Sequence, residues 1–267
     1  MKKFLAKSYI WILLLLLYAP IFFIAIFSFT ESKVLGNWTG FSTKLYSNLF
    51  TGDMQGTGTL MSAIENTLII AVIAAGVSTL LGTFAAVGIH NLRGRKRQAL
   101  TFLNNIPMIN PDIITGVSLF LLFVFLHVSQ GYVTVILAHI TFCTPYVVLS
   151  VLPKLTSMNP NIYEAALDLG ATPSQAMRKV LAPLLRPGMI SGFILAFTMS
   201  LDDFAVTFFT RGTIGLDTLS TYIYTDARKG GLTPEFRPLI TIIFLTVLIL
   251  LIIINLRQIR NVKKQER

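Results

Sequence analysis

The stretch YIWILLLLLYAPIFFIAIFSF, residues 9–29, contains no charged side chain. A helix of about 20 apolar residues spans a hydrocarbon layer about 30 Å thick, because each helical residue rises about 1.5 Å. The stretch is too long for the core of a secretory signal, and TESKV follows it without a small-residue cleavage site. It therefore predicts a retained membrane-spanning helix, with a kink at Pro20.

The composition of the whole chain agrees with a membrane protein. Of the 267 residues 54% are hydrophobic and only 13% are charged, a balance unlike that of a soluble domain. Cys143 is the single cysteine, which excludes an internal disulfide framework. Apolar windows predict six spans, at about 9–29, 63–89, 99–128, 132–152, 187–210 and 238–256. We therefore expect an all-α membrane protein with six transmembrane helices in a single domain over residues 1–267.

The basic residues predict the orientation of these spans. Sixteen of the 22 lysines and arginines lie in the amino-terminal arm, the second-to-third connection, the loop 153–186 and the carboxyl-terminal tail. The other six are Lys33, Lys44, Arg211, Arg228, Lys229 and Arg237. The positive-inside rule therefore places both termini and the loop 153–186 in the cytoplasm. Because the bases are scattered over four segments, the net charge of +10 reflects topology, and nucleic acid is not an expected partner.

A polar sequence, EAALDLGATPSQAMRKVLAP at residues 164–183, interrupts the apolar segments. Asn159 followed by Pro160 is a helix start signal and Gly170 a stop signal, so a short helix is expected over about 160–169. Thr172, Pro173 and Gln175 repeat the start signal as a capping box. The second helix is expected to end at Pro183, because proline lacks the backbone N–H that continues a helix.

The first short helix has two distinct faces. An apolar stripe at helical spacing is formed by Ile162, Ala165, Ala166 and Leu169. Glu164 and Asp168 share another face. Spacing alone leaves two interpretations open: the loop packs on the cytoplasmic ends of its own helices, or it docks into a soluble protein.

The same loop carries a recognisable family motif. Glu164, Ala165, Ala166, Gly170 and Pro183 resemble the EAA motif of ABC importer permeases, which seats in a cleft of the cytoplasmic ATPase subunit. Two mild departures are Ala182, where leucine usually precedes the proline, and Val180, where isoleucine is frequent. The segments NWTGFSTKLYSNLF, NPDIITGVSLFLLF, HITFCTPYVVLSVLPKL and FTMSLDDF resemble the second permease subunit of spermidine/putrescine importers.

This resemblance implies a fold, partners and a location. The implied fold is that of a MetI-like permease, with residues 153–186 as the coupling loop and Glu164, Ala165, Ala166, Gly170 and Pro183 as its ATPase-coupling residues. The implied partners are a second permease subunit, a dimer of ATPase subunits, an extracytoplasmic binding protein and membrane lipid. The implied location is the bacterial plasma membrane. Polyamine is the implied substrate, with iron or thiamine as alternatives.

No enzyme chemistry is expected within this chain. The sequence contains no GxxxxGK[ST] motif to cradle phosphates, so ATP and Mg²⁺ would bind in a partner ATPase and no cofactor in this chain. The three histidines, His90, His127 and His139, are far apart and lack nearby second ligands, so no metal site is expected. A histidine within an apolar helix more often packs or bridges helices.

Asp112 lies in the third predicted span, and Asp202 and Asp203 lie in the fifth. A charge at mid-bilayer costs on the order of 2.5–3.5 kcal/mol, so such groups normally face a water-filled path or a partner. Residues 99–153 and 187–210 contain no lysine or arginine to neutralise them. An organic cation could therefore use these acids along its path.

Helix capping is the alternative role for these acids, because prolines at 107 and 111 free backbone groups that polar side chains could satisfy. The two interpretations stay open for Asp112. For the pair Asp202 and Asp203 the path is favoured, since adjacent like charges are an unfavourable cap.

Two other classes of membrane protein are less consistent with the sequence. An ion-coupled secondary carrier predicts internal repeats, and no convincing repeat relates the two halves. A membrane enzyme needs a nucleophile, a base or a metal set at a common depth, and no such set is evident. The outer segments 30–62 and 211–236 are too polar to span and fit either a docking surface or solvated connections.

Overall fold

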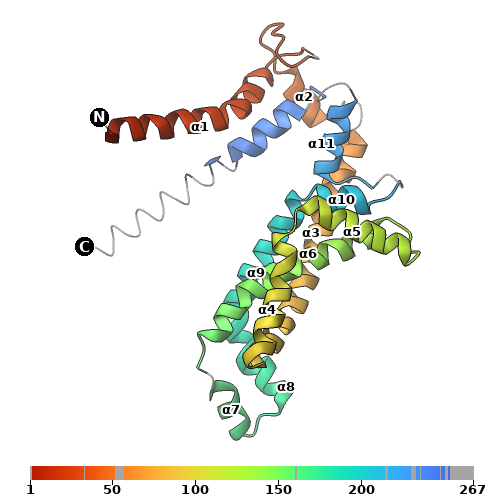
Figure 1. Cartoon of the computed structure of the whole chain (residues 1–267). Helices are drawn as coiled ribbons and strands as arrows, with labels where there is room; N and C mark the ends of the chain where they lie inside the picture. Colours follow the sequence, from red (N-terminus) through yellow and green to blue (C-terminus); the bar gives the residue numbers. More distant parts are fainter. Residues whose placement is uncertain are drawn as a thin grey trace. The chain divides into compact units, whose positions relative to one another are not determined.

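The structure is a computed structural model, and it describes residues 2–32, 34–51, 57–159, 161–213, 216–229, 233–234, 236–246, 248–249 and 252. These residues form helices and connecting loops, with no β-strand among them (Figure 1). The helices are α1 (Lys2–Phe27), α2 (Lys44–Thr51), α3 (Thr57–Asn91), α4 (Gly94–Ile109), α5 (Asp112–Phe125), α6 (Tyr132–Thr156), α7 (Asn161–Asp168), α8 (Pro173–Ala176), the π-helix η1 (Met177–Leu181), α9 (Ala182–Asp202), α10 (Ala205–Thr210) and α11 (Leu219–Arg228).

Several helices have the length and apolarity of membrane spans. Tyr9–Phe27, Thr59–Asn91, Tyr132–Thr156 and Pro173–Asp202 each qualify alone, and α4 with α5 qualifies as one bent span. The predicted sixth span, 238–256, is described as a helix over Phe236–Thr246, and most of its remainder lies outside the described residues. An all-helical multi-pass membrane protein is thus confirmed, whereas the count of six and the side on which the termini lie stay predictions.

The chain divides into two compact units, and the first combines Met1–Gly58 with Ile223–Arg267. Within this unit, Tyr18 and Phe22 of α1 lie with their ring centroids 6.4 and 6.5 Å from that of Phe244. Arg237 is fully buried, and its Nη1 donates to the backbone oxygen of Ser32 at 2.9 Å. The start of the last helix is thereby tied to the connection that follows α1. The assignment of residues 1–267 to a single domain stays a prediction.

The second unit, Thr59–Tyr222, is built around α6. Figure 1 shows α3 and α9 beside α6, and glycines allow both contacts to be close. A Cβ on Gly82 of α3 would lie 2.6 Å from the Cβ of Val147, and a Cβ on Gly192 of α9 would lie 3.1 Å from Val147 Cγ1. Val147 is itself fully buried. The core of this unit therefore follows the face of α6 that carries Val147.

The predicted third span, 99–128, corresponds to two helices with a sharp bend between them. α4 and α5 meet at an angle of 104°, a bend that is visible in Figure 1. Asn110 and Pro111 at the break both have extended backbone angles, with ψ of 137°. A residue before proline is driven out of the α region by a clash with the proline ring. The break therefore has a local cause, and Asp112 becomes the first residue of α5.

The expectation that Pro183 ends the second loop helix is wrong. Proline in a helix interior costs about 3 kcal/mol, because it lacks an N–H and its ring meets the carbonyl of residue i−4. The chain avoids termination by widening into the π-helix η1, in which the N–H of Ala182 donates to the oxygen of Met177. Pro183 then falls in the first turn of α9, where a missing N–H is tolerated. The result is a continuous helical segment over Pro173–Asp202.

The predicted fifth span, 187–210, is interrupted near its end. α9 ends at Asp202, Asp203 is extended with φ −65° and ψ 131°, and the short helix α10 begins at Ala205. Gly116 of α5 lets α10 approach closely, because a Cβ on Gly116 would lie 3.1 Å from the backbone oxygen of Ala205. The two acidic residues therefore lie at a helix break.

The predicted topology can be tested with single cysteines. Ser174 in α8 and Ala227 in α11 are both exposed, and the native Cys143 is fully buried, so labelling at the introduced positions should dominate. We expect Ser174→Cys to react with an impermeant thiol reagent only from the cytoplasmic side and Ala227→Cys only from the outer side. Reaction of both from one side would contradict the six-span topology.

Candidate functional site

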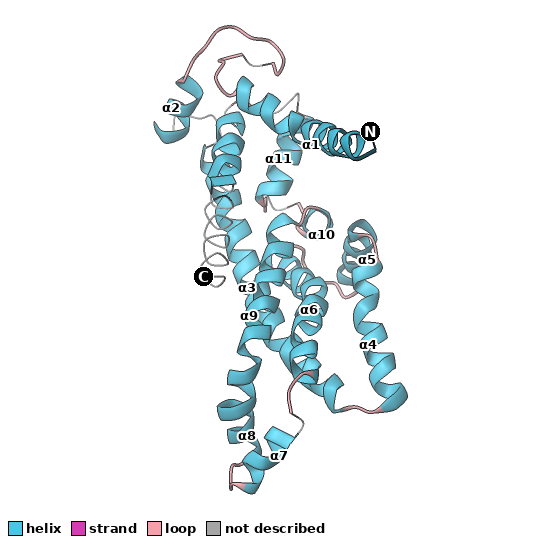
Figure 2. Cartoon of the chain, turned by 90° about the vertical axis from the view of Figure 1, so that its left-hand side faces the viewer, coloured by secondary structure: helices cyan, strands magenta, loops and turns pink. Residues whose placement is uncertain are grey.

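The loop between α6 and α9 folds as two short helices, α7 and α8, with the predicted caps. The backbone N–H of Asn161 donates to Asn159 Oδ1 at 3.0 Å, which caps the start of α7. Thr172 and Gln175 form the reciprocal capping box of α8, at 3.0 and 3.3 Å. In both Figures 1 and 2 these helices lie at the end of α6 and α9 farthest from α10.

Gly170 makes the turn between the two short helices. Its φ is +85°, a left-handed angle that glycine adopts without steric cost. Its N–H donates to Leu167 O at 2.9 Å, and the N–H of Ala171 donates to Ala166 O at 3.1 Å. These two bonds are the pattern of a Schellman motif. The predicted stop at Gly170 is therefore confirmed.

The apolar stripe of α7 contains both buried and exposed residues. Ala166 is buried at 8% exposure, whereas the side chain of Leu169 is 89% exposed. Ala165 is also exposed. A leucine this exposed beside a small residue gives α7 an apolar face that nothing in the described part of the chain covers. We refer to Ala165 and Leu169, the residue that directly follows α7, as the exposed face of α7.

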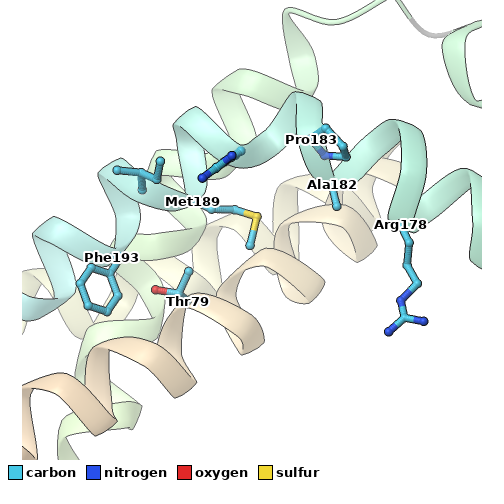
Figure 3. A pocket seen from close by; sticks show the side chains of 8 residues that line it. Thr79, Arg178, Ala182, Pro183, Met189 and Phe193 are labelled. Atoms are coloured by element: carbon cyan, nitrogen blue, oxygen red, sulfur yellow. The ribbon is translucent and has the colours of Figure 1, made fainter.

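Two other residues predicted to couple to an ATPase lie away from that face. Glu164 lines a cavity of about 450 Å³, together with Arg93 and Arg97 from the connection and helix that follow α3. Pro183 lines a separate groove of about 490 Å³ beside α3. Figure 3 shows Ala182 and Pro183 with Met189 and Phe193 from the same helical segment.

The three acids predicted for the substrate path share one cavity. Asp112, Asp202 and Asp203 line a space of about 600 Å³ with the aromatic rings of Phe142 and Phe204. The two helix breaks bring them together, since Asp112 begins α5 and the other two acids lie where α9 ends. Residues 90 positions apart in the sequence thus line the same cavity.

Asp203 is held by an extensive hydrogen-bond network. Its Oδ1 accepts from the N–H of Val206 at 3.1 Å, and its Oδ2 accepts from both the N–H and the hydroxyl of Thr207 at 2.8 Å. The Nε2 atom of His139 lies 3.4 Å from the same Oδ2. The side chain of Asp203 is only 5% exposed. This acid therefore caps the start of α10.

That cap corrects the sequence argument against capping by the aspartate pair. Two adjacent charges at one helix end would repel each other. The chain instead separates their roles, because Asp202 completes α9 while the extended backbone of Asp203 lets its carboxylate reach α10. Asp202 is exposed, and within the described residues no hydrogen bond or ion pair is recorded for its carboxylate.

Asp112 is exposed in the first turn of α5. Its negative charge suits the positive end of the helix dipole, although no backbone N–H among the described residues donates to its carboxylate. A cap of the kind that Asp203 makes is therefore not seen at Asp112. Its carboxylate lies at the cavity, as that of Asp202 does.

His139 is the residue of this site that the sequence analysis did not select. It is fully buried and bridges α6 to Ser200 of α9 and Thr207 of α10, which confirms the expectation of a helix-bridging histidine. Its proximity to Asp203 arises from the packing of α6 against α10, which no local sequence pattern predicts. An ionisable residue within an apolar helix was the available signal.

The segment after α10 packs onto the same end of the second unit. Arg211 forms an ion pair with Asp217, and the side chain of Asn66 in α3 donates to the backbone oxygen of Asp217 at 2.9 Å. Ser220 Oγ donates to the backbone oxygen of Asp203 at 2.7 Å. These bonds hold residues 217–220 over the break between α9 and α10, whereas the sequence left them as a docking surface or a solvated connection.

The helices are long enough to cross a membrane, and acids line a cavity where two of them break, an arrangement that suits a membrane transport protein. Comparison with known proteins identifies the class further. The family model described as "Binding-protein-dependent transport system inner membrane component" matches residues 78–261. The chain belongs to this family of transport permeases.

Named relatives support that assignment over most of the chain. The chain is 40% identical over 234 residues to the putrescine transport system permease protein PotI of Escherichia coli (strain K12), covering 85% of this chain and 81% of the relative. It is 35% identical over 255 residues to the spermidine/putrescine transport system permease protein PotC of Haemophilus influenzae, covering 96% of each. A crystal structure of a bacterial ABC transporter that imports alginate shares the fold, with a TM-score of 0.66, 15% identity and coverage of 96% and 95%.

Proposed function

We propose that this chain is a membrane-spanning permease subunit of an ATP-driven importer and that its cargo is a polyamine such as putrescine or spermidine. The observation that carries the choice of cargo is the convergence of Asp112, Asp202 and Asp203 on one cavity. The names of the relatives PotI and PotC point to the same cargo.

The chemistry of the cavity suits a flexible organic cation. Two exposed carboxylates, of Asp112 and Asp202, can each receive an ammonium group. Phe142 and Phe204 line the same space, and aromatic faces attract ammonium groups and pack against methylene chains. Binding here must stay weak, since a site that held the cation tightly would hinder its release.

The exposed face of α7 is the proposed contact with an ATPase. Ala165 and Leu169 present a small and a large apolar side chain on a short helix whose orientation is set by Gly170. Ala166 instead packs inward, so its proposed coupling role would be indirect. Glu164 and Pro183 would act through the cavity and groove that they line.

The remaining partners and the location follow from the family. Its description as binding-protein-dependent supports delivery of cargo by an extracytoplasmic binding protein. We further propose a second permease subunit, a dimer of ATPase subunits that bind ATP and Mg²⁺, and lipid of the bacterial inner membrane. In this proposal the chain crosses the membrane six times with both termini in the cytoplasm, and it binds no cofactor of its own.

Reconstitution of the purified complex in vesicles tests the proposal. Radiolabelled putrescine and spermidine should accumulate only with binding protein outside and ATP at the ATPase. An excess of unlabelled polyamine should abolish accumulation, whereas thiamine and ferric iron should not compete. Transport of thiamine or iron in place of polyamine would overturn the cargo while retaining the importer, and ATP-independent uptake driven by an ion gradient would overturn the importer.

A further inference from the structure

His139 lies at the meeting point of three helices beside the acid-lined cavity. Its Nδ1 lies 2.6 Å from Ser200 Oγ in α9, and its Nε2 lies 2.9 Å from Thr207 Oγ1 in α10. All three side chains are buried, with exposures of 0, 4 and 0% for His139, Ser200 and Thr207. One imidazole ring therefore connects α6 to both sides of the break between α9 and α10.

The hydrogen bonds assign the ring proton. Thr207 has one hydroxyl proton, and it donates this proton to Asp203 Oδ2 at 2.8 Å. The Thr207 oxygen can then only accept from His139, so Nε2 carries a proton. That N–H also lies 3.4 Å from Asp203 Oδ2. His139 thus supports the carboxylate of Asp203 both directly and through Thr207.

We infer that His139 is a positioning residue for the substrate path, holding the break between α9 and α10 so that the Asp202 carboxylate is presented to the cavity. Asp203 is the fixed member of the aspartate pair, because its oxygens are already engaged by Val206, Thr207 and His139. Asp202 is the exposed member at the end of α9. This inference rests on the proposed cation path.

The backbone at the break explains why side-chain hydrogen bonds are needed to hold it. Residues 203 and 204 separate the two helices, so no continuous α-helical ladder fixes the direction in which α9 ends. The hydrogen bonds of His139 hold the break from the side of α6. On the side of residues 217–220, Ser220 Oγ donates to the backbone oxygen of Asp203 at 2.7 Å. Loss of the imidazole would leave the buried oxygens of Ser200 and Thr207 without this partner.

The test compares three substitutions in the assembled complex. His139→Leu removes both polar contacts, and we expect polyamine uptake per assembled complex to fall about tenfold, which corresponds to roughly 1.4 kcal/mol. His139→Gln can donate toward Thr207 and accept from Ser200, so it should restore much of the uptake. Thr207→Val is nearly isosteric and keeps the imidazole ring, and it should lower uptake in the same manner. It provides the test if His139→Leu assembles poorly.

A double-mutant cycle with Asp202→Asn separates positioning from a general loss of stability. If His139 acts by placing Asp202, either His139→Leu or Thr207→Val should cost little further uptake once Asp202 is already Asn, because residues that act through one another are not additive. Cys143→Ala is the matched control: Cys143 is also buried on α6, but its thiol donates to the backbone oxygen of Ala196 in α9 at 3.4 Å and not to Ser200, Thr207 or Asp203. Its effect should be additive with Asp202→Asn.

Each outcome of the cycle decides the inference. Coupling with Asp202, together with rescue by His139→Gln, supports it. If Asp202→Asn lowers uptake and its effect adds fully to that of the His139 or Thr207 variant, the positioning role is overturned. The cation path then remains intact. Wild-type uptake by Asp202→Asn overturns the inference, because His139 then has no acid of the path to position, whereas the cation path falls only if Asp112→Asn also shows wild-type uptake.

Discussion

Replacing Gly170 with valine is expected to lower ATP-driven polyamine uptake at least about tenfold while the membrane helices remain folded. The left-handed conformation costs an ordinary residue roughly 1–2 kcal/mol, and a β-branched residue is a genuine outlier there. The φ of +85° at Gly170 therefore has to change. The Schellman bonds that orient α7 against α8 would be lost with it, and the exposed face of α7 would be misplaced.

The open surroundings of Gly170 separate the effect on backbone conformation from steric crowding. A Cβ built at Gly170 meets no atom within 4 Å, so the expected effect is one of backbone conformation and not of crowding. Gly170→Asn should retain most uptake, because asparagine tolerates left-handed angles. Gly76→Val in α3 is a second control, since Gly76 also has open space but has no positive φ recorded.

The measurements are uptake in vesicles, co-purification of the ATPase and ATP hydrolysis stimulated by loaded binding protein. We expect all three to fall together for Gly170→Val and to stay near wild type for the two controls. Normal uptake and normal co-purification by a well-expressed Gly170→Val variant would refute the role of this turn in coupling.

Neutralising Asp202 is expected to reduce uptake about tenfold with little loss of assembled complex. Two unit charges 4 Å apart at an effective dielectric constant of about 20 interact by about 4 kcal/mol, so a tenfold change, or roughly 1.4 kcal/mol, leaves room for the cost of desolvation. Asp202→Asn keeps the size of the side chain and removes the charge. Because no structural bond of the Asp202 carboxylate is recorded within the described residues, the change should spare folding.

The other two acids should respond differently to the same substitution. Asp112→Asn should resemble Asp202→Asn if Asp112 lines the path, and should mainly reduce expression if its interaction with the helix end is what matters. Asp203→Asn should lower both uptake and assembly, because the asparagine amide would place donors opposite the donors of Val206 and Thr207.

Glu65→Gln provides the matched control for loss of charge, because Glu65 is an exposed acid on the spanning helix α3. Uptake is normalised to assembled complex in each case, and binding of cargo by the external protein alone should not change. Wild-type uptake by Asp202→Asn and Asp112→Asn together would refute the cation path, while the permease assignment would remain.

Local sequence signals determined most of the helices and their caps. The capping box of Thr172 and Gln175, the turn at Gly170 and the cap at Asn159 were predictable because each depends on bonds within a few residues. Hydropathy predicted the spans for a similar reason, since about 20 apolar residues are long enough to cross the hydrocarbon layer. The motif in the loop also identified the class of transporter.

Local signals were ambiguous where proline offered two outcomes. Pro183 could end a helix or be accommodated by a wider turn, and the chain uses the π-helix η1. Because the helix continues past Pro183, α9 stays packed on α6. Gly188 allows this close approach, since a Cβ at this position would lie 3.3 Å from the backbone oxygen of Ser150. The helix therefore continues past Pro183 together with packing between helices, and no local sequence pattern contains that packing.

Hydropathy alone predicts that acids lie within the membrane spans, but the contacts of each acid depend on how the helices pack. Asp202 and Asp203 are neighbours of one residue type, yet Asp203 is buried in a network with His139 and Asp202 is exposed at the cavity. The difference arises because His139 and Thr207, 68 positions apart, meet across packed helices. A charge in a membrane is costly wherever it lies, and the fold sets which partner offsets that cost.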